Sequence, residues 1–431
     1  MLLCRLLYTD TVDYSTSREG IALSQAESGA LTIQAKGSHD SVCGEVRSPL
    51  PAHAQTTTTS RTWGRFFPHL PPSHRKRGHT VTKISPPDQP SAWSNTLYGC
   101  AYGDAWGNTN EFVRYSSLTR GNPLGPDLPG KLIITDDTQM TLALARALNT
   151  ADLKDQHAIQ SQIVHEFVLW RNDPDNNRAP GTTCLGATAA LEAGHPWTKA
   201  TRPNSFGCGS VMRVSPAAFL PEDLWRPVAA WQAAATHGHP IGIAASLVAA
   251  AIIRQGARGQ ITPGALVDTA IALCSDQMLL DGVPDWLAGH PQADTPARAA
   301  TLLDKGFTAL TGNLRAAQRA VDAFQHDPWH DDPCRYTGEG WNAQEALATA
   351  LLCADALPHD PVDALRRATV TGGDSDSIAA IAGAIIGPLH TDPWPAEWQA
   401  RLEPRYRHWI TEATGYSFTN SPCPLSGSPT Q

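Results

Sequence analysis

Two short acidic stretches, each at the start of an apolar helical pattern, constrain the fold of this chain more than any other feature. The first covers residues 135–139 and precedes apolar positions at helical spacing through Leu148. A helix cap explains part of it, because Gln139 follows Asp136 by three residues as in a capping box. A cap needs one oxygen, however, and four consecutive side chains here carry oxygen, as Mg2+ prefers: Thr135, Asp136, Asp137 and Thr138.

The second acidic stretch lies far downstream, at residues 372–377, where two glycines precede Asp374, Asp376 and Ser377. Small apolar residues from 378 to 387 follow it and predict a deeply buried helix that ends before Pro388. Helix capping is again the alternative interpretation. A dinuclear site holds its ions about 3.5–4 Å apart and needs several bridging oxygens. One pair of cations between the two helix ends would therefore account for both stretches.

Composition limits the class of protein. The chain has 431 residues, 41% of them hydrophobic, which is enough for a large core, and its net charge of −8 argues against a nucleic-acid-binding face. Its nine cysteines include no C-x-x-C pair, which favours a reduced, cytoplasmic protein. The apolar run at residues 1–7 is too short for a signal peptide. The longest apolar run, residues 241–253, falls short of the ~20 residues that a bilayer requires, so we expect a buried helix and no membrane association.

Residues 1–94 differ from the rest of the chain. They contain a Thr/Ser run at 56–60, a basic run at 74–77 and many prolines, with no sustained helical period. We predict a mostly disordered leader, whose basic run is a solvated patch rather than a nucleic-acid contact. Because no methionine lies between Met1 and Met140, a further hypothesis places the true start near Val81 or later. We expect an ordered domain at 95–415 and a flexible tail at 416–431.

Helical patterns dominate the predicted ordered domain, and no strand pattern alternates over any length. We therefore predict an all-α fold, a compact multi-helix orthogonal bundle. Gly99, Gly103 and Gly107 share one helix face, so a neighbouring helix can pack closely against them. Asp104 lies within this stretch, and a buried carboxylate must be paired or hydrogen-bonded.

Two further stretches carry polar groups that suit a binding site. Residues 204–213 are rich in glycine and hydroxyl groups, which fits either a phosphate-binding loop or an ordinary turn. His237 and His239 suggest a metal, but a structural role or one behind the ligands is favoured because no further His or Cys has zinc spacing nearby.

The motifs occur in a recognisable order: Gly103-Asp104-Ala105 with Glu111-Phe112, Thr135 to Thr138, Arg178-x-x-Gly181-Thr182, Gly207 to Arg213, Thr236 to Pro240, Gly338 to Trp341, and Gly372 to Ser377. This set resembles the ADP-ribosylglycohydrolase family. The resemblance covers roughly residues 95–389, and the paired acidic motifs are its specific part. It implies a compact all-α domain with two Mg2+ (or Mn2+) ions in a central cleft.

The resemblance also implies a role for each candidate site residue. The metal ligands would be Thr135, Asp136 and Asp137 from one helix end, and Asp374, Asp376 and Ser377 from the other. Glu111 would be the catalytic residue, although its spacing alone fits a surface glutamate beside a buried Phe112. The substrate-binding residues would be Arg178, Gly181, Thr182, Gly207, Cys208, Gly209, Ser210, His237 and Trp341.

The implied activity is hydrolysis of the glycosidic bond between ADP-ribose and an acceptor, which reverses ADP-ribosylation. Metals would orient the ribose and activate water, and a carboxylate would stabilise the oxocarbenium character of the transition state. The substrate would be an ADP-ribosylated protein or small molecule, and we expect a monomer. Trp106 and Phe206 depart from the family pattern and leave the acceptor open. The alternatives are a non-catalytic ADP-ribose-binding or toxin-neutralising protein and a structural protein.

Overall fold

The computed structural model describes the backbone of residues 21–25, 31–35 and 90 and the whole of residues 91–418. It divides into two units, Met1–His79 and Thr80–Gln431. In the first unit, β1 (Ile21–Gln25) pairs antiparallel with β2 (Leu31–Ala35). This hairpin was not expected, because five-residue strands are too short for a periodicity argument. The predicted disorder elsewhere in the leader, its basic run, the start-site hypothesis and the tail beyond residue 418 lie outside the described residues.

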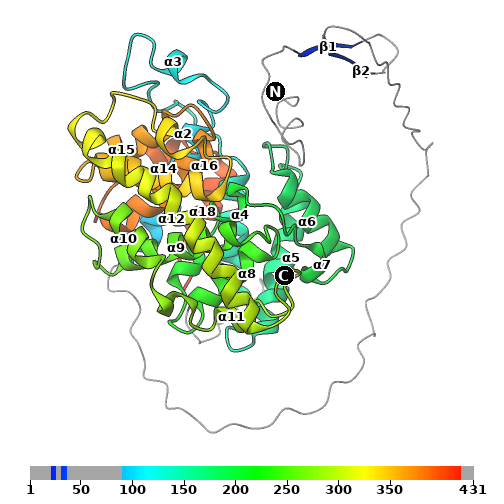
Figure 1. Cartoon of the computed structure of the whole chain (residues 1–431). Helices are drawn as coiled ribbons and strands as arrows, with labels where there is room; N and C mark the ends of the chain where they lie inside the picture. The colour runs from blue at the N-terminus through cyan, green and yellow to red at the C-terminus, as the bar shows by residue number, and fades with distance from the viewer. Residues whose placement is uncertain (1–20, 26–30, 36–89, 419–431) are drawn as a thin grey trace, which may run out of the picture. The chain divides into compact units, whose positions relative to one another are not determined.

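The second unit is helical throughout its described part, which confirms the predicted all-α class (Figure 1). Its first helix begins at Pro90, five residues before the expected boundary. The elements, with 3-10 helices labelled η, are α2 (Pro90–Gly107), α3 (Tyr115–Leu118), α4 (Asp136–Thr150), α5 (Gln156–Arg171), α6 (Thr182–Glu192), α7 (Trp197–Ala200), η1 (Cys208–Ser210), η2 (Ser215–Phe219), α8 (Trp225–Ala234), α9 (Pro240–Ala257), α10 (Leu266–Leu273), η3 (Gln277–Leu280), α11 (Val283–Trp286), α12 (Pro296–His326), α13 (Cys334–Thr337), α14 (Ala343–Ala356), α15 (Pro361–Thr369), α16 (Ser375–Ile386), η4 (Gly387–Leu389), α17 (Trp398–Arg401) and α18 (Pro404–Thr414).

Helices α2 and α16 pack backbone against backbone, as the glycine spacing predicts. A Cβ atom added at Gly99, Gly103 or Gly107 would lie 2.0–2.2 Å from a carbonyl oxygen of α16. The carbonyls that they meet belong to Gly383, Ala379 and Ser375, in reverse order, so the two helices run antiparallel. Only glycine permits this approach. The contact brings the end of α2 to the start of α16, where the second acidic stretch lies.

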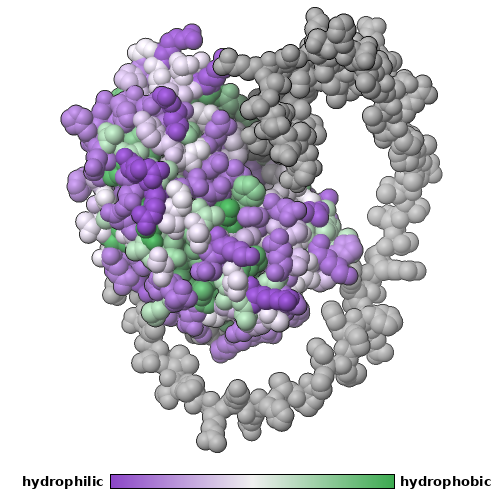
Figure 2. Space-filling model, in the orientation of Figure 1, coloured by the Kyte–Doolittle hydropathy of each residue, from purple (hydrophilic) through white to green (hydrophobic). Residues whose placement is uncertain are grey.

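Helix α9 forms part of the core, between α8, α12 and α14 (Figure 1). Among the described residues it is the one helix long and apolar enough to cross a membrane, but 89% of its apolar window is buried inside the fold. This burial confirms the prediction of a buried helix from residues 241–253. The face shown in Figure 2 is largely hydrophilic, with scattered small apolar areas, as expected when the apolar helix faces point inward.

Candidate metal centre

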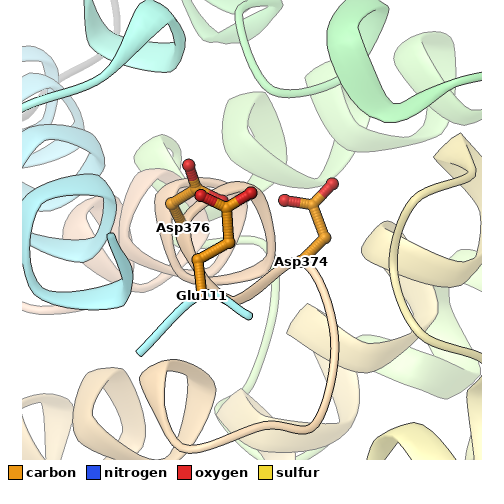
Figure 3. A group of neighbouring side chains, drawn as sticks. All are labelled: Glu111, Asp374 and Asp376. Atoms are coloured by element: carbon orange, nitrogen blue, oxygen red, sulfur yellow. The ribbon is translucent and has the colours of Figure 1, made fainter. Parts of the chain in front are cut away.

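Three carboxylates from distant parts of the chain converge in the second unit. Glu111, Asp374 and Asp376 are buried, and each offers an oxygen that lies within 4.8 Å of the other two. Glu111 comes from the turn after α2, while the two aspartates come from the start of α16, and all three side chains point into the same space (Figure 3). Residues 374–377 were predicted to hold one half of a metal site. The structure places Glu111 in the same cluster as Asp374 and Asp376.

Backbone contacts fix the start of α16. The Asp374 N–H donates to the Glu339 carbonyl at 2.8 Å, and a Cβ at Gly373 would lie 1.9 Å from that same oxygen. Asp374 is the N-cap residue of α16, yet its side chain accepts no capping hydrogen bond there. Asp376 accepts from the Ser377 N–H at 3.0 Å. Capping therefore leaves the Asp374 carboxylate unexplained.

The first acidic stretch lies at the start of α4, as predicted, and its side chains make different contacts. The Thr135 hydroxyl caps the helix by accepting from the Asp137 N–H at 3.3 Å. Asp136 accepts from the Gly181 N–H at 3.2 Å, which ties α4 to the turn before α6. Asp137 is buried, and its Oδ2 atom has no hydrogen-bond partner among the described residues. The capping interpretation therefore accounts for Thr135 and not for Asp137.

Asp104, on α2, joins the two halves and was not among the predicted site residues. Its carboxylate accepts from the Thr135 N–H at 2.9 Å, from the Thr138 N–H at 3.0 Å and from the Thr138 hydroxyl. Burial, followed by the nearby Asp376 carboxylate, raises its pKa to about 7. The sequence signal was the polar residue within the close-packing glycine face, and the structure explains it as an anchor for the start of α4.

The acidic residues repel one another in the absence of a cation. Burial, with Asp376 as the next cause, raises the pKa of both Asp137 and Asp374 well above the usual range. Asp374 Oδ1, like Asp137 Oδ2, is a buried oxygen with no hydrogen-bond partner in the described part of the chain. Unpartnered buried carboxylate oxygens are costly unless a cation neutralises them. These hard oxygen donors fit Mg2+ or Mn2+.

The predicted phosphate-binding loop lies directly beside this cluster. The Cys208 N–H donates to the Trp341 carbonyl at 3.0 Å, and Gly207 forms an isolated bridge with Asn342. The Cys208 thiol donates to Asp374 Oδ2 at 3.0 Å. Ser210 is buried, with its hydroxyl 3.5 Å from the Gly242 carbonyl. Cys208 thus contacts the acidic cluster, while the contacts of Gly207 and Ser210 are to Asn342 and Gly242.

His237 lies behind that loop. A Cβ at Gly209 would approach the His237 ring to 3.0 Å, which explains why the loop needs glycine there. One ring nitrogen of His237 lies 2.9 Å from the Thr236 hydroxyl. Burial and the neighbouring Arg213 guanidinium hold its pKa well below the usual range, so the ring is neutral at physiological pH. These contacts support the structural interpretation of His237, and substrate contact stays a prediction.

Arg178 is engaged elsewhere in the structure. Its guanidinium donates to both oxygens of Glu403, at 2.7 and 2.9 Å, and to the Ile134 carbonyl at 2.9 Å. It therefore holds the segment before α4 against the segment before α18. Thr182 is exposed at the start of α6, beside Gly181. Substrate binding by Arg178, Gly181 and Thr182 stays a prediction. The contacts of Arg178 and Gly181 support a role in positioning Thr135 and Asp136.

An aromatic pair lies at the rim of the cluster. Phe112, which follows Glu111, is 43% exposed, and its ring stacks on Trp341 with centroids 5.6 Å apart and planes at 23°. The backbone φ of Phe112 is +64°, a left-handed value that is costly for a residue with a side chain. The alternative of a surface Glu111 beside a buried Phe112 is wrong on both points, because Glu111 is buried and the turn directs the Phe112 side chain outward to Trp341.

The two departures from the family pattern lie in different environments. Trp106 is buried and packs edge-on against Trp398, with its indole N–H donating to the Pro126 carbonyl. Phe206 packs against His239 at a centroid distance of 4.9 Å. Trp106 is therefore a core residue, while Phe206 belongs to the loop beside the cluster.

The helical fold and the oxygen-rich centre together are typical of one family of proteins. The sequence profile of the ADP-ribosylglycohydrolase family matches residues 87–422, and this chain belongs to that family. It is similar to the ADP-ribosyl-dinitrogen reductase glycohydrolase of Rhodospirillum rubrum, with 32% identity over 324 residues that cover 71% of this chain and 88% of that protein.

Two further relatives have lower sequence identity to this chain. The uncharacterized protein YegU of Escherichia coli is 27% identical, covering 68% of this chain and 86% of that protein. The human ADP-ribosylhydrolase ARH3 is 24% identical, covering 73% and 89%. This chain is also similar to a solved structure of an ADP-ribosylglycohydrolase-related protein complex, and the match covers 75% of this chain and 96% of the other. The TM-score of 0.52, at 21% sequence identity, supports the fold.

Proposed function

We propose that this protein is a metal-dependent hydrolase that cleaves the glycosidic bond between ADP-ribose and an acceptor. The observation that carries the proposal is the buried cluster of Glu111, Asp374 and Asp376. Asp374 within it and Asp137 beside it each have one carboxylate oxygen with no hydrogen-bond partner among the described residues. Family membership and the names of the relatives, two of which are ADP-ribosyl hydrolases by name, support the substrate class.

The proposed ligands are those of the two acidic stretches. Asp137 and Asp374 are the strongest candidates, because their free oxygens gain most from a cation, and Asp376 lies within the same cluster. Thr135, Asp136 and Ser377 complete the proposed set. A bound pair of Mg2+ or Mn2+ ions would supply ribose orientation and a lowered pKa for a bound water. The number and the identity of the ions are part of the proposal.

Glu111 is the proposed general base. Its carboxylate is buried within the cluster, which keeps bulk water away and favours a proton-accepting role toward a positioned water. Asp104 holds the start of α4 in register, and Arg178 holds the segment before it. The loop at residues 207–210 and Trp341 are proposed to contact ADP-ribose, since they border the cluster.

The experiment is the release of free ADP-ribose from modified substrates. Purified protein with Mg2+ is incubated with arginine-modified protein, serine-modified protein and ADP-ribosylated small molecules, and the product is quantified by mass spectrometry. Glu111→Gln and Asp374→Asn are tested in parallel, and Asp127→Asn, at an exposed surface ion pair, is the matched control. Release by the wild type and by the control, but by neither site variant, supports the proposal. ADP-ribose binding without release would favour the non-catalytic alternative.

We also propose that the protein acts as a monomer in the cytoplasm. Five cysteines of the described region are free thiols, which suits a reducing compartment: Cys100, Cys208, Cys274, Cys334 and Cys353. Light scattering coupled to gel filtration tests the monomer, and microscopy of the tagged full chain tests the compartment.

A further inference from the structure

One sulfur atom lies within the otherwise oxygen-lined cluster. Cys208, at the start of η1, directs its thiol to Asp374 Oδ2 at 3.0 Å, while Asp374 Oδ1 stays unpartnered among the described residues. Burial, followed by the carboxylates of Asp374 and Asp137, holds the pKa of this thiol well above its usual range, so the thiol keeps its proton in the absence of a cation. The thiol thus contacts a proposed metal ligand at the start of α16.

The same backbone segment holds both the thiol and its carboxylate partner. Glu339 accepts from the Asp374 N–H at 2.8 Å, and Trp341 accepts from the Cys208 N–H at 3.0 Å. Both residues are therefore pinned to the stretch before α14. Backbone hydrogen bonds therefore hold Cys208 and Asp374 near each other.

Sulfur changes which cations such a centre accepts. Mg2+ prefers oxygen donors, whereas Zn2+ and related thiophilic ions bind thiolate strongly. A tetrahedral zinc ion with bonds of about 2.3 Å to sulfur and about 2.1 Å to oxygen places the two ligand atoms about 3.6 Å apart. The observed 3.0 Å between Cys208 Sγ and Asp374 Oδ2 is close to that separation. A small side-chain rotation would therefore admit the ion.

We propose that Cys208 makes this centre a mixed sulfur–oxygen site that binds a thiophilic divalent cation, with Cys208 and Asp374 as ligands, in competition with Mg2+ or Mn2+. The incoming cation takes the place of the thiol proton, which leaves to solvent, and no oxidation is involved. The proposal rests on the metal centre of the proposed function, but it can be tested without any hydrolysis. Its consequence is that Zn2+ or Cd2+ inhibits the hydrolase.

The test titrates Cd2+ into the metal-free full-length protein and follows the ultraviolet charge-transfer band of a cadmium thiolate. Cys208→Ser is the test variant, because serine keeps a hydroxyl donor for Asp374. Cys274→Ser is the matched control, since it removes a half-buried thiol on a different helix end. Wild type and control should show a tight band that Cys208→Ser lacks. The Cd2+ affinity of Cys208→Ser should fall by at least roughly 10–100-fold. Loss of a residue that only supports a metal ligand already has an effect of that size, and Cys208 is proposed to be a ligand itself. An unchanged band in Cys208→Ser would overturn the proposal.

Competition and activity separate this proposal from the proposed function. Excess Mg2+ should shift the Cd2+ midpoint of the wild type to higher concentration, and a midpoint independent of Mg2+ would refute the shared centre. If hydrolysis is observed, Cd2+ inhibition is compared after each variant is normalised to its own Mg2+-supported rate, and Cys208→Ser should resist. If no substrate is hydrolysed, the proposed function fails while the cadmium band still decides the role of Cys208.

Discussion

Removal of the divalent cation should make the folding stability of this protein fall as the pH rises from about 4 to about 7. Burial and the Asp376 carboxylate raise the pKa of Asp104 from 3.8 to about 7. In this window the folded state keeps a proton that the unfolded state has lost, so stability decreases with rising pH. The shift of about 3 units corresponds to about 4 kcal/mol at 1.36 kcal/mol per unit. A bound cation stabilises the ionised cluster and should remove most of this loss.

The assay is urea unfolding followed by circular dichroism, at several pH values between about 5 and about 7.5, with EDTA or with saturating Mg2+. Asp355 is a built-in control, because burial raises its pKa to about 6 on α14, where it accepts from the Leu266 and Val267 N–H groups. Its contribution has the same sign and is equal in both conditions, so the difference between the two curves isolates the acidic cluster. Parallel curves with and without Mg2+ would refute the reasoning.

Three substitutions test other parts of the account, and a fourth, Gly312→Ala, is a matched control for one of them. Glu111→Gln should slow single-turnover hydrolysis by roughly 10²–10⁴-fold, the usual cost of losing a general base, while the Mg2+-induced rise in Tm is kept. Asp137→Asn removes one repelling, unpartnered carboxylate, so it should raise the Tm of the metal-free protein and reduce the Mg2+-induced rise; a lower metal-free Tm would contradict this. Gly103→Ala places a Cβ 2.0 Å from the Ala379 carbonyl and should cost roughly 1–3 kcal/mol in urea unfolding, whereas Gly312→Ala, with open space on α12, should stabilise by roughly 0.5–1 kcal/mol.

The two acidic stretches could be predicted from sequence because each is local. Carboxylates and hydroxyls at the start of an apolar helix leave a pattern within a few residues, and the structure places Asp137 and Asp374 in one buried environment. The glycine spacing on α2 likewise predicted a close helix contact that exists. Local patterns are therefore sufficient where a residue's task is set by its own helix.

Tasks set by distant partners could not be predicted. Arg178 lies in a motif that suits substrate binding, but Glu403, far along the chain, takes its guanidinium. Asp104 was noted as a buried carboxylate, yet the groups that donate hydrogen bonds to it, the Thr135 and Thr138 N–H groups, depend on how α2 meets α4. The outward direction of the Phe112 side chain could not be predicted, because its left-handed backbone has no marker such as glycine or asparagine.

The contact between α2 and α16 also determines when the site can exist during folding. The first of these helices is near the start of the second unit and the other is near its end, so their pairing closes a very long loop and belongs to the slow, non-local part of folding. During synthesis, α2 emerges long before its partner. Asp104 and Glu111 are therefore synthesised long before Asp374 and Asp376. The four carboxylates come close to one another only after almost the whole helical unit has been made. Assembly of the repulsive centre is thereby postponed until the surrounding helices are available to hold it.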